Sequence, residues 1–292
     1  MADRMSVHGG LRVSGARRAA LMALFGVFAP ALALAHGGGE VSLRLHQASF
    51  SAGPIELEFE MAREDDGHPV APGDLDLVHE RRLHGFLLDE GLGELRHVHP
   101  EFIDGIWKVR TEVQRSGRYR FYAQGRTMDS SPGAGDGEEF TAESAMEVGG
   151  GLPAAPVPPV LLDQRSGADG GSRITLDRGR LFAKRLSMIF VRFSRDDGSA
   201  PEVQPWLGAM VHAAIVPERL GVDGGSLLHA HAHDHQGALM IHTTFPAAGM
   251  YRVWVQFQDA GVIRTVPLAV RVDEALASTR IRAGKGDHQP RT

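Results

Sequence analysis

An internal repeat constrains the fold of this chain more than any other feature of its 292-residue sequence. Three segments of the first half recur in the same order in the second half, and the longest pair aligns without gaps and shares Gly, Thr, Tyr, Arg and Gln at equivalent positions. The matching segments are residues 82–92 with 210–220, 95–99 with 227–231, and 105–124 with 237–256. A supersecondary unit that occurs twice predicts two domains of the same fold.

Each copy has the side-chain periodicity of β-strands. Ile55, Leu57 and Phe59 alternate with glutamates, which is typical of a strand buried on one face. Residues 84–88 and 212–216 are instead apolar on both faces apart from one histidine, as expected for central strands. The 36 glycines and 16 prolines supply turns between short strands. We therefore expect an all-β chain made of two tandem immunoglobulin-like β-sandwiches.

The first 35 residues have the pattern of a secretory signal peptide. Basic residues precede the apolar run 19–34, which is shorter than the roughly 20 residues of a membrane-spanning helix and leads into an Ala-x-Ala motif. Cleavage is expected after Ala35, so the mature chain is predicted to be periplasmic or secreted and to begin at His36. No later stretch reaches 18 uninterrupted apolar residues, so we expect no transmembrane segment in the mature chain.

Composition divides the rest of the chain. The Gly- and Pro-rich residues 149–159 are typical of a linker, and the polar, basic residues from 275 onward lack periodicity. The predicted parts are a signal peptide at 1–35, sandwiches at 36–149 and 173–274, a linker at 150–172 and a disordered tail at 275–292.

The cysteine count and the net charge exclude several classes of function. With no cysteine, the chain has no disulfide, thiolate zinc site, iron–sulfur cluster or cysteine nucleophile. The net charge of −5, from 31 basic and 36 acidic residues, provides no basic field for nucleic acid. We expect no nucleic-acid partner, and the absence of hydrolase, P-loop and H-E-x-x-H motifs favours a non-catalytic protein.

Histidine is the residue type that indicates a function. The chain has 15 histidines, and nine of them fall in two windows, 79–99 and 212–235. Residues i and i+2 of a strand lie on the same side, so the H-x-H segments can present imidazoles to one ion, with a histidine of the preceding strand as a third ligand. The candidate ligands are His84, His97 and His99 in the first copy, His212, His229, His231, His233 and His235 in the second, and His36 at the mature N-terminus.

A metal held by these residues would have nitrogen ligands. Imidazole suits Cu(II), Zn(II) and Ni(II), and an N-terminal histidine forms a chelate that suits the tetragonal preference of Cu(II). The glycine-flanked segment HAHAHDH at 229–235 is typical of metal-binding histidine tracts. Copper is therefore the predicted ion, with zinc or nickel as alternatives.

Four segments carry a resemblance to a known group of proteins. They are HVHP at 97–100, PEVQPWLGAMVH at 201–212, FPAAGMYRVWVQFQ at 245–258 and TVPLAVRV at 265–272. Together they resemble bacterial secreted proteins with tandem immunoglobulin-like domains, a mostly uncharacterised group that is suspected of metal handling, especially of copper. More distantly, His36 and the strand pattern are similar to the CopC-type periplasmic copper-resistance proteins, in which an N-terminal histidine takes part in Cu(II) binding.

The residues leave three functions open. The first is a periplasmic metal buffer or carrier that uses the histidine clusters. The second is an envelope interaction module, in which the histidines are structural and a periplasmic or envelope protein is the partner. The third is a copper enzyme based on His36. One other pair of residues is interpreted as structural: Tyr119 and Tyr251 stand where Greek-key sandwiches carry a tyrosine corner.

Overall fold

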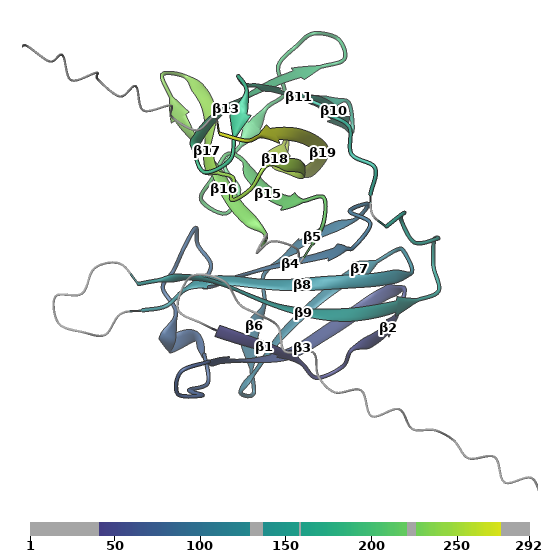
Figure 1. Ribbon diagram of the computed structural model, residues 1–292, viewed down its shortest axis with the longest axis vertical. Helices are drawn as coiled ribbons and strands as arrows, with labels where there is room; N and C mark the ends of the chain where they lie inside the picture. The colour runs from purple at the N-terminus through teal and green to yellow at the C-terminus, as the bar shows by residue number, and fades with distance from the viewer. Residues whose placement is uncertain (1–40, 129–136, 158, 221–225, 276–292) are drawn as a thin grey trace, which may run out of the picture. The chain divides into compact units, whose positions relative to one another are not determined.

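Strands account for almost all of the regular structure, as the side-chain alternation predicts (Figure 1). The computed structural model describes residues 41–128, 137–157, 159–220 and 226–275. Within these ranges there is one 3-10 helix, η1 (Pro72–Asp74), and no α-helix. The all-β prediction is confirmed, with sheets arranged as β-sandwiches. The predicted signal peptide, His36 and the tail from 276 lie outside the described residues.

The first copy of the repeat folds into two antiparallel layers. One sheet has the order β1-β3-β7-β6 and the other the order β2-β9-β8-β4-β5, in which the short β2 joins β9 in parallel. The bounds are β1 (Val41–Leu45), β2 (Ser49–Ser51), β3 (Gly53–Arg63), β4 (Leu83–Asp89), β5 (Leu95–Val98), β6 (Glu101–Ile103), β7 (Ile106–Val113), β8 (Gly117–Arg126) and β9 (Glu139–Gly149). Side chains from both sheets, such as Phe59 and Phe121 with ring centroids 5.1 Å apart, form the core between them.

The second copy follows the same plan with one continuous path of strands. Its order is β10-β11-β13-β17-β16-β15-β18-β19-β12, and β14 pairs with β18. The bounds are β10 (Ser166–Asp169), β11 (Ser172–Asp177), β12 (Leu181–Phe182), β13 (Leu186–Arg195), β14 (Val203–Gln204), β15 (His212–Pro217), β16 (Leu228–His235), β17 (Ala238–Thr244), β18 (Gly249–Asp259) and β19 (Val262–Asp273). Strand β10 lies in the predicted linker, so pairing begins earlier than composition indicates.

Strand β16 belongs to both layers of the second sandwich. Residues 228–231 pair with β15 in one layer, whereas residues 232–235 pair with β17 in the other. In the first copy, β5 and β6 together take this place, and Pro100 stands between them. Proline has no N–H for a sheet ladder, so it interrupts the pairing where the chain changes layers. Each copy thus brings its H-x-H segment to the same corner of its sandwich.

Strands β4 and β15 are apolar on both faces because each face meets a different core. Leu87 of β4 and Ile215 of β15 pack inside their own sandwiches. The alternate side chains, such as Phe86 and Ala214, belong to a third buried cluster that draws on both copies. The sequence explanation, a central strand within one sandwich, is therefore incomplete. The second apolar face is covered by residues of the other copy.

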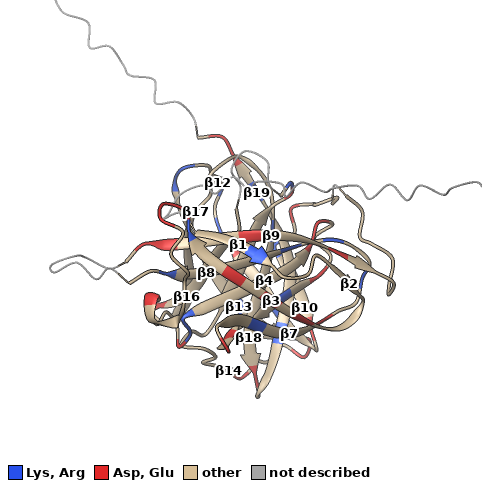
Figure 2. Cartoon of the chain, turned by 90° about the horizontal axis from the view of Figure 1, so that it is seen from below, with Lys and Arg blue, Asp and Glu red and all other residues tan. Residues whose placement is uncertain are grey.

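Charged residues are interleaved over the strands, with acidic and basic side chains next to each other (Figure 2). The glutamates that alternate along β3 face outward and pair with basic residues of the flanking strands. Lys108 Nζ lies 2.7 Å from Glu58, and Arg110 contacts Glu56. Exposed pairs of this kind contribute little to stability, so their main effect is to keep this face polar.

The two predicted tyrosine corners form the same hydrogen bond in both copies. The Tyr251 hydroxyl donates to the carbonyl of Ala247 at 2.9 Å, and the Tyr119 hydroxyl lies 3.1 Å from the carbonyl of Arg115, also four residues upstream. Tyr119 has a second acceptor, the buried carboxylate of Glu94 at 2.7 Å. Loss of the Tyr119 hydroxyl would therefore remove a donor from a buried carboxylate, whereas loss of the Tyr251 hydroxyl would affect backbone groups only.

We predict that Tyr119→Phe destabilises the protein more than Tyr251→Phe does. Removal of the Tyr251 hydroxyl costs a neutral hydrogen bond, roughly 1 kcal/mol, whereas removal of the Tyr119 hydroxyl takes a donor from a buried carboxylate, roughly 1.5–3 kcal/mol. Urea unfolding of the two variants beside the parent chain measures the difference. Equal losses would contradict the role given to Glu94.

Candidate metal centre

Six histidines, three from each copy, gather into one cluster. The cluster consists of His84 on β4, His97 on β5 and His99 just after it, with His212 on β15 and His229 and His231 on β16. The register of the strands explains the grouping within each copy. Phe86 lies opposite His97 in the β4–β5 ladder, and the equivalent Ala214 lies opposite His229 in the β15–β16 ladder. The histidine of the first strand is therefore beside the H-x-H segment in both sandwiches.

In the first copy, two imidazole nitrogens face each other at the distance that one metal ion requires. His84 is buried, with 3% of its surface exposed, and its Nε2 lies 3.1 Å from the carbonyl oxygen of Val78. Its Nδ1 lies 3.3 Å from His97 Nε2. Two nitrogens at about 2.0–2.1 Å from one tetrahedral ion are about 3.3–3.4 Å apart, so this separation fits shared coordination.

The second copy repeats this geometry. His212, with 1% of its surface exposed, has its Nε2 2.8 Å from the carbonyl oxygen of Trp206. Its Nδ1 lies 3.4 Å from His229 Nε2. Both carbonyls lie six residues before their histidine, so the whole arrangement, and not only the histidines, is duplicated.

A tight turn presents each of these carbonyls. Val78 and Arg81 exchange backbone hydrogen bonds across His79 and Glu80, which have φ values of 47° and 64°. Trp206 and Ala209 do the same across a Leu-Gly pair with φ values of 50° and 72°. Positive φ at both central positions defines the type I′ turn, in which residues other than Gly, Asn and Asp are uncommon. The chain therefore holds unfavourable backbone angles at His79 and Glu80 where the turn supports His84.

Hydrogen bonds fix the proton positions in the first copy. A carbonyl only accepts, so His84 Nε2 carries the proton that it donates to Val78, and Nδ1 of the neutral ring keeps its lone pair. Gln256 presents its amide oxygen 2.9 Å from His97 Nδ1, while its amide nitrogen donates to Thr265. His97 therefore donates from Nδ1, and its Nε2 also keeps a lone pair. With the Gln256 amide in this orientation, the lone pairs of His84 Nδ1 and His97 Nε2 face each other.

The two groups of three histidines are in contact. The ring centroids of His84 and His229 are 5.0 Å apart, and those of His97 and His212 are 5.6 Å apart. Nitrogens of His84, His97 and His99 lie within 4.8 Å of one another, and the same holds for His97, His212 and His229. Gln256 of the second copy orients His97 of the first, so the second sandwich also supports a ligand of the first.

Two buried ring nitrogens in the cluster have no hydrogen-bond partner. They are Nε2 of His99 and Nε2 of His231, which occupy equivalent positions in the two copies. A buried polar atom without a partner is costly, and a cation bound at each nitrogen would supply the missing partner.

Burial keeps the six rings neutral, which is the state that binds metals. It lowers the pKa of His84 to about 4 and, together with the nearby His84 ring, the pKa of His99 to about 3. It also lowers the pKa of His97 and His229 well below the ordinary value, with further contributions from neighbouring histidines. The pKa values of the last two rings, His212 and His231, are lowered for the same reason.

The other predicted ligands lie elsewhere. His233 and His235 continue along β16 beyond the change of layer, and both are exposed. The ring of His235 faces Phe190, with centroids 6.3 Å apart. Neither His233 nor His235 belongs to the close nitrogen groups. His36 lies outside the described residues.

Several residues of the site were not among the predicted ligands. The ring of His79 is tilted against that of His231 with centroids 3.7 Å apart, and Trp206 lies edge-on to His212 at 4.9 Å. Gln256 and its repeat equivalent Gln124 are identical at aligned positions, which is the one signal in the sequence that could have indicated them. The role of the Val78 carbonyl has no signal in the sequence, because any residue type supplies a carbonyl.

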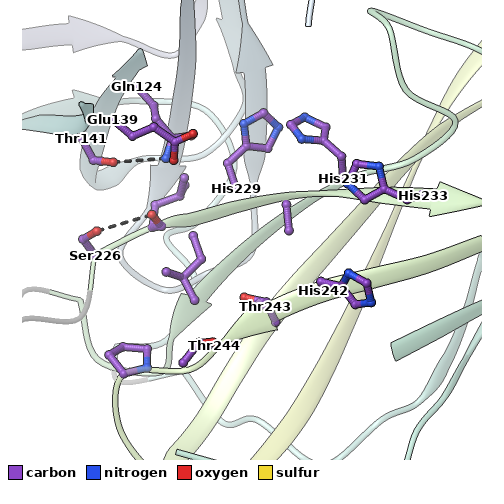
Figure 3. A pocket seen from close by; sticks show the side chains of 14 residues that line it. Gln124, Glu139, Thr141, Ser226, His229, His231, His233, His242, Thr243 and Thr244 are labelled. Atoms are coloured by element: carbon purple, nitrogen blue, oxygen red, sulfur yellow. Dashed lines mark hydrogen bonds between the residues drawn. The ribbon is translucent and has the colours of Figure 1, made fainter. Parts of the chain in front are cut away.

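A cavity of about 520 Å³ lies beside the second group of histidines (Figure 3). Figure 3 shows the histidines of β16 following one another along the strand, with His242 on the neighbouring strand β17. The polar lining includes Gln124, Glu139 and Thr141 from the first copy and His229, His231, His233 and His242 from the second. The cavity is thus polar and carries a carboxylate, which suits a hydrated cation better than an apolar ligand.

Comparison with known proteins adds one match to a family. A family described as a domain of unknown function, DUF8832, matches residues 166–274, a range that begins with β10 and ends just after β19. No curated protein matches the chain at a significant level of sequence similarity.

Solved structures resemble the chain only weakly. The fibronectin(III)-like modules of Clostridium thermocellum CbhA are 10% identical, with 85% of this chain and 100% of that chain covered and a TM-score of 0.22. The Escherichia coli adhesin FdeC is 15% identical, with 80% and 63% covered and a TM-score of 0.22. A DUF4785 family protein from Legionella pneumophila is 8% identical, with 77% and 53% covered and a TM-score of 0.27. The chain thus spans less than two thirds of the last two proteins, and scores at this level carry no argument about function.

Among the described residues, no helix is long and apolar enough to cross a membrane.

We predict that the metal-free protein becomes less stable as the pH falls from 7.5 to 5. The folded state keeps the buried rings neutral, whereas the unfolded chain takes up protons below the ordinary histidine pKa of 6.5. The unfolded state then binds more protons, so the free energy of unfolding decreases as the pH decreases. Urea unfolding at a series of pH values in a chelator measures this slope.

The matched control is His235→Gln, which changes an exposed histidine of β16 outside the cluster. His99→Gln should make the slope shallower. A stability that is constant or rises between pH 7.5 and pH 5 would contradict the burial of neutral rings.

Proposed function

We propose that this chain is a periplasmic or secreted metal-binding protein that holds its ion on imidazole nitrogens and acts as a buffer or carrier rather than as an enzyme. The observation that carries the proposal is the pair of ring nitrogens His84 Nδ1 and His97 Nε2, which face each other at 3.3 Å and both carry lone pairs when the Gln256 amide oxygen accepts from His97 Nδ1. Two lone pairs repel unless a cation lies between them. Because burial disfavours a proton on either ring, a metal ion is the cation that fits.

The surroundings of the two rings support the same proposal. Histidines that bind metals usually donate their other ring N–H to a carbonyl or carboxylate, which fixes the ring and its tautomer. His84 donates to the Val78 carbonyl and His97 to the Gln256 amide oxygen, so both rings are oriented in this manner. His99 Nε2, which has no hydrogen-bond partner, supplies a third nitrogen.

Copper is the ion that we propose. The close groups contain histidine nitrogens alone, without carboxylate or thiolate. Sites of this kind bind Cu(II) more tightly than the other divalent first-row ions, Zn(II) and Ni(II) included. The resemblance to secreted proteins suspected of copper handling agrees with this choice.

We predict that the ion raises the melting temperature of the parent chain and that His97→Gln loses most of the effect. A ligand that binds only the folded state stabilises it by about 2.7 kcal/mol at 100 times its Kd. Thermal unfolding with Cu(II), Cu(I), Zn(II) or Ni(II), each against a chelator control, measures the shift. His97 is the ring to change because it belongs to both close nitrogen groups.

The matched control is again His235→Gln, for which the full shift is expected. Circular dichroism of metal-free His97→Gln shows whether the variant is folded, so that a lost shift is not taken for a lost fold. No shift of the parent chain with any of the four ions would refute the proposal and favour the interaction module with structural histidines.

A further inference from the structure

We infer that the cluster holds two metal ions side by side, one on His84, His97 and His99 and one on His212, His229 and His231. This inference rests on the proposed function and adds the number and arrangement of the ions. The inference starts from the internal repeat. If the first copy forms a metal site, the second copy should form one too, provided that the surrounding residues are also duplicated.

The duplication extends to three features of the site, whereas the close nitrogen groups include His99 but not its equivalent His231. The facing nitrogens are 3.3 Å apart in the first copy and 3.4 Å apart in the second. The outer nitrogen of each buried histidine meets a carbonyl presented by a turn of the same type. Each copy also leaves one Nε2 buried without a partner, on His99 and on His231.

A single ion does not account for these observations. The close nitrogen groups contain five histidines, and the ring of His231 lies 4.3 Å from that of His229, so more imidazoles converge here than the three of one close group. One ion on His97, His212 and His229, the close group that joins the copies, would leave His99 Nε2 and His231 Nε2 unsatisfied. Two ions use all six rings, three for each ion.

The two ions would be close enough to interact. His97 has a nitrogen within 4.8 Å of nitrogens of His212 and His229, so the ligands of the two ions are neighbours. The ring of His84 also lies 5.0 Å from that of His229. Two Cu(II) ions at such a separation couple their unpaired electrons, which lowers the electron paramagnetic resonance signal below the copper content.

Access to the two ions differs. The cavity is lined by His229 and His231 but by none of the three histidines of the first site, and Glu139 adds a carboxylate to its wall. The ion on the second copy is therefore the one that exchanges with solvent through the cavity.

The test is the metal content of the full mature chain after loading with Cu(II) and removal of free ion. We expect two copper ions per chain for the parent, one for His99→Gln, one for His231→Gln and two for the control His235→Gln. The substituted nitrogens have no hydrogen-bond partners, so we expect both single variants to fold, which circular dichroism verifies. A chelator should remove one ion from the parent faster than the other.

Paramagnetic resonance of the parent chain gives a second readout that needs no variant. The signal should account for much less than the copper present, and each single variant should regain a full signal for its one ion. One ion per parent chain with a full signal would overturn the two-ion arrangement and leave the proposed function intact. No bound ion at all would overturn the proposed function itself.

Discussion

The apolar contact between the outward faces of β4 and β15 is the interaction on which the candidate centre depends. Phe86 and Leu88 of one strand and Ala214 and Val216 of the other enter one buried cluster. His84 and His212 precede Phe86 and Ala214 by two positions, so strand geometry places their rings on the same faces. Apolar burial, roughly 25 cal/mol per Å², drives the contact, and the histidines are carried into it with the strands. The polar centre is thus held in place by hydrophobic packing.

Placing imidazoles in such a position has a cost that the surroundings offset. A buried ring loses hydration, and this is why the pKa values of the six histidines are lowered. The turn carbonyls of Val78 and Trp206 and the amide of Gln256 recover part of that loss. These groups leave His99 Nε2 and His231 Nε2 without a hydrogen-bond partner, and a bound cation would satisfy such nitrogens. The unfavourable φ angles at His79 and Glu80 occur in the turn that presents the Val78 carbonyl to His84. Backbone strain of this kind is often retained next to functional sites.

Sequence reasoning anticipated much of the fold and part of the site. The alternation along β3 and the repeated Gly-x-Tyr segments indicated sandwiches, because strand periodicity depends on neighbouring residues alone. The same-face rule grouped His97 with His99 and His229 with His231 correctly as neighbours. His233 and His235 lie outside the close nitrogen groups, and β16 pairs with β17 instead of β15 from residue 232 onward. Periodicity does not reveal such a change of partner strand.

By itself, the sequence determined that one β-unit occurs twice and that each copy carries three histidines at strand spacing, because local spacing and repetition are written in the chain. Only the tertiary structure decided that the two sets meet. That outcome depends on which apolar face of β4 and β15 finds a partner in the other copy, and both faces of these strands look alike in sequence. The proton positions were also decided there, since they follow from carbonyl and amide groups that come close only after folding.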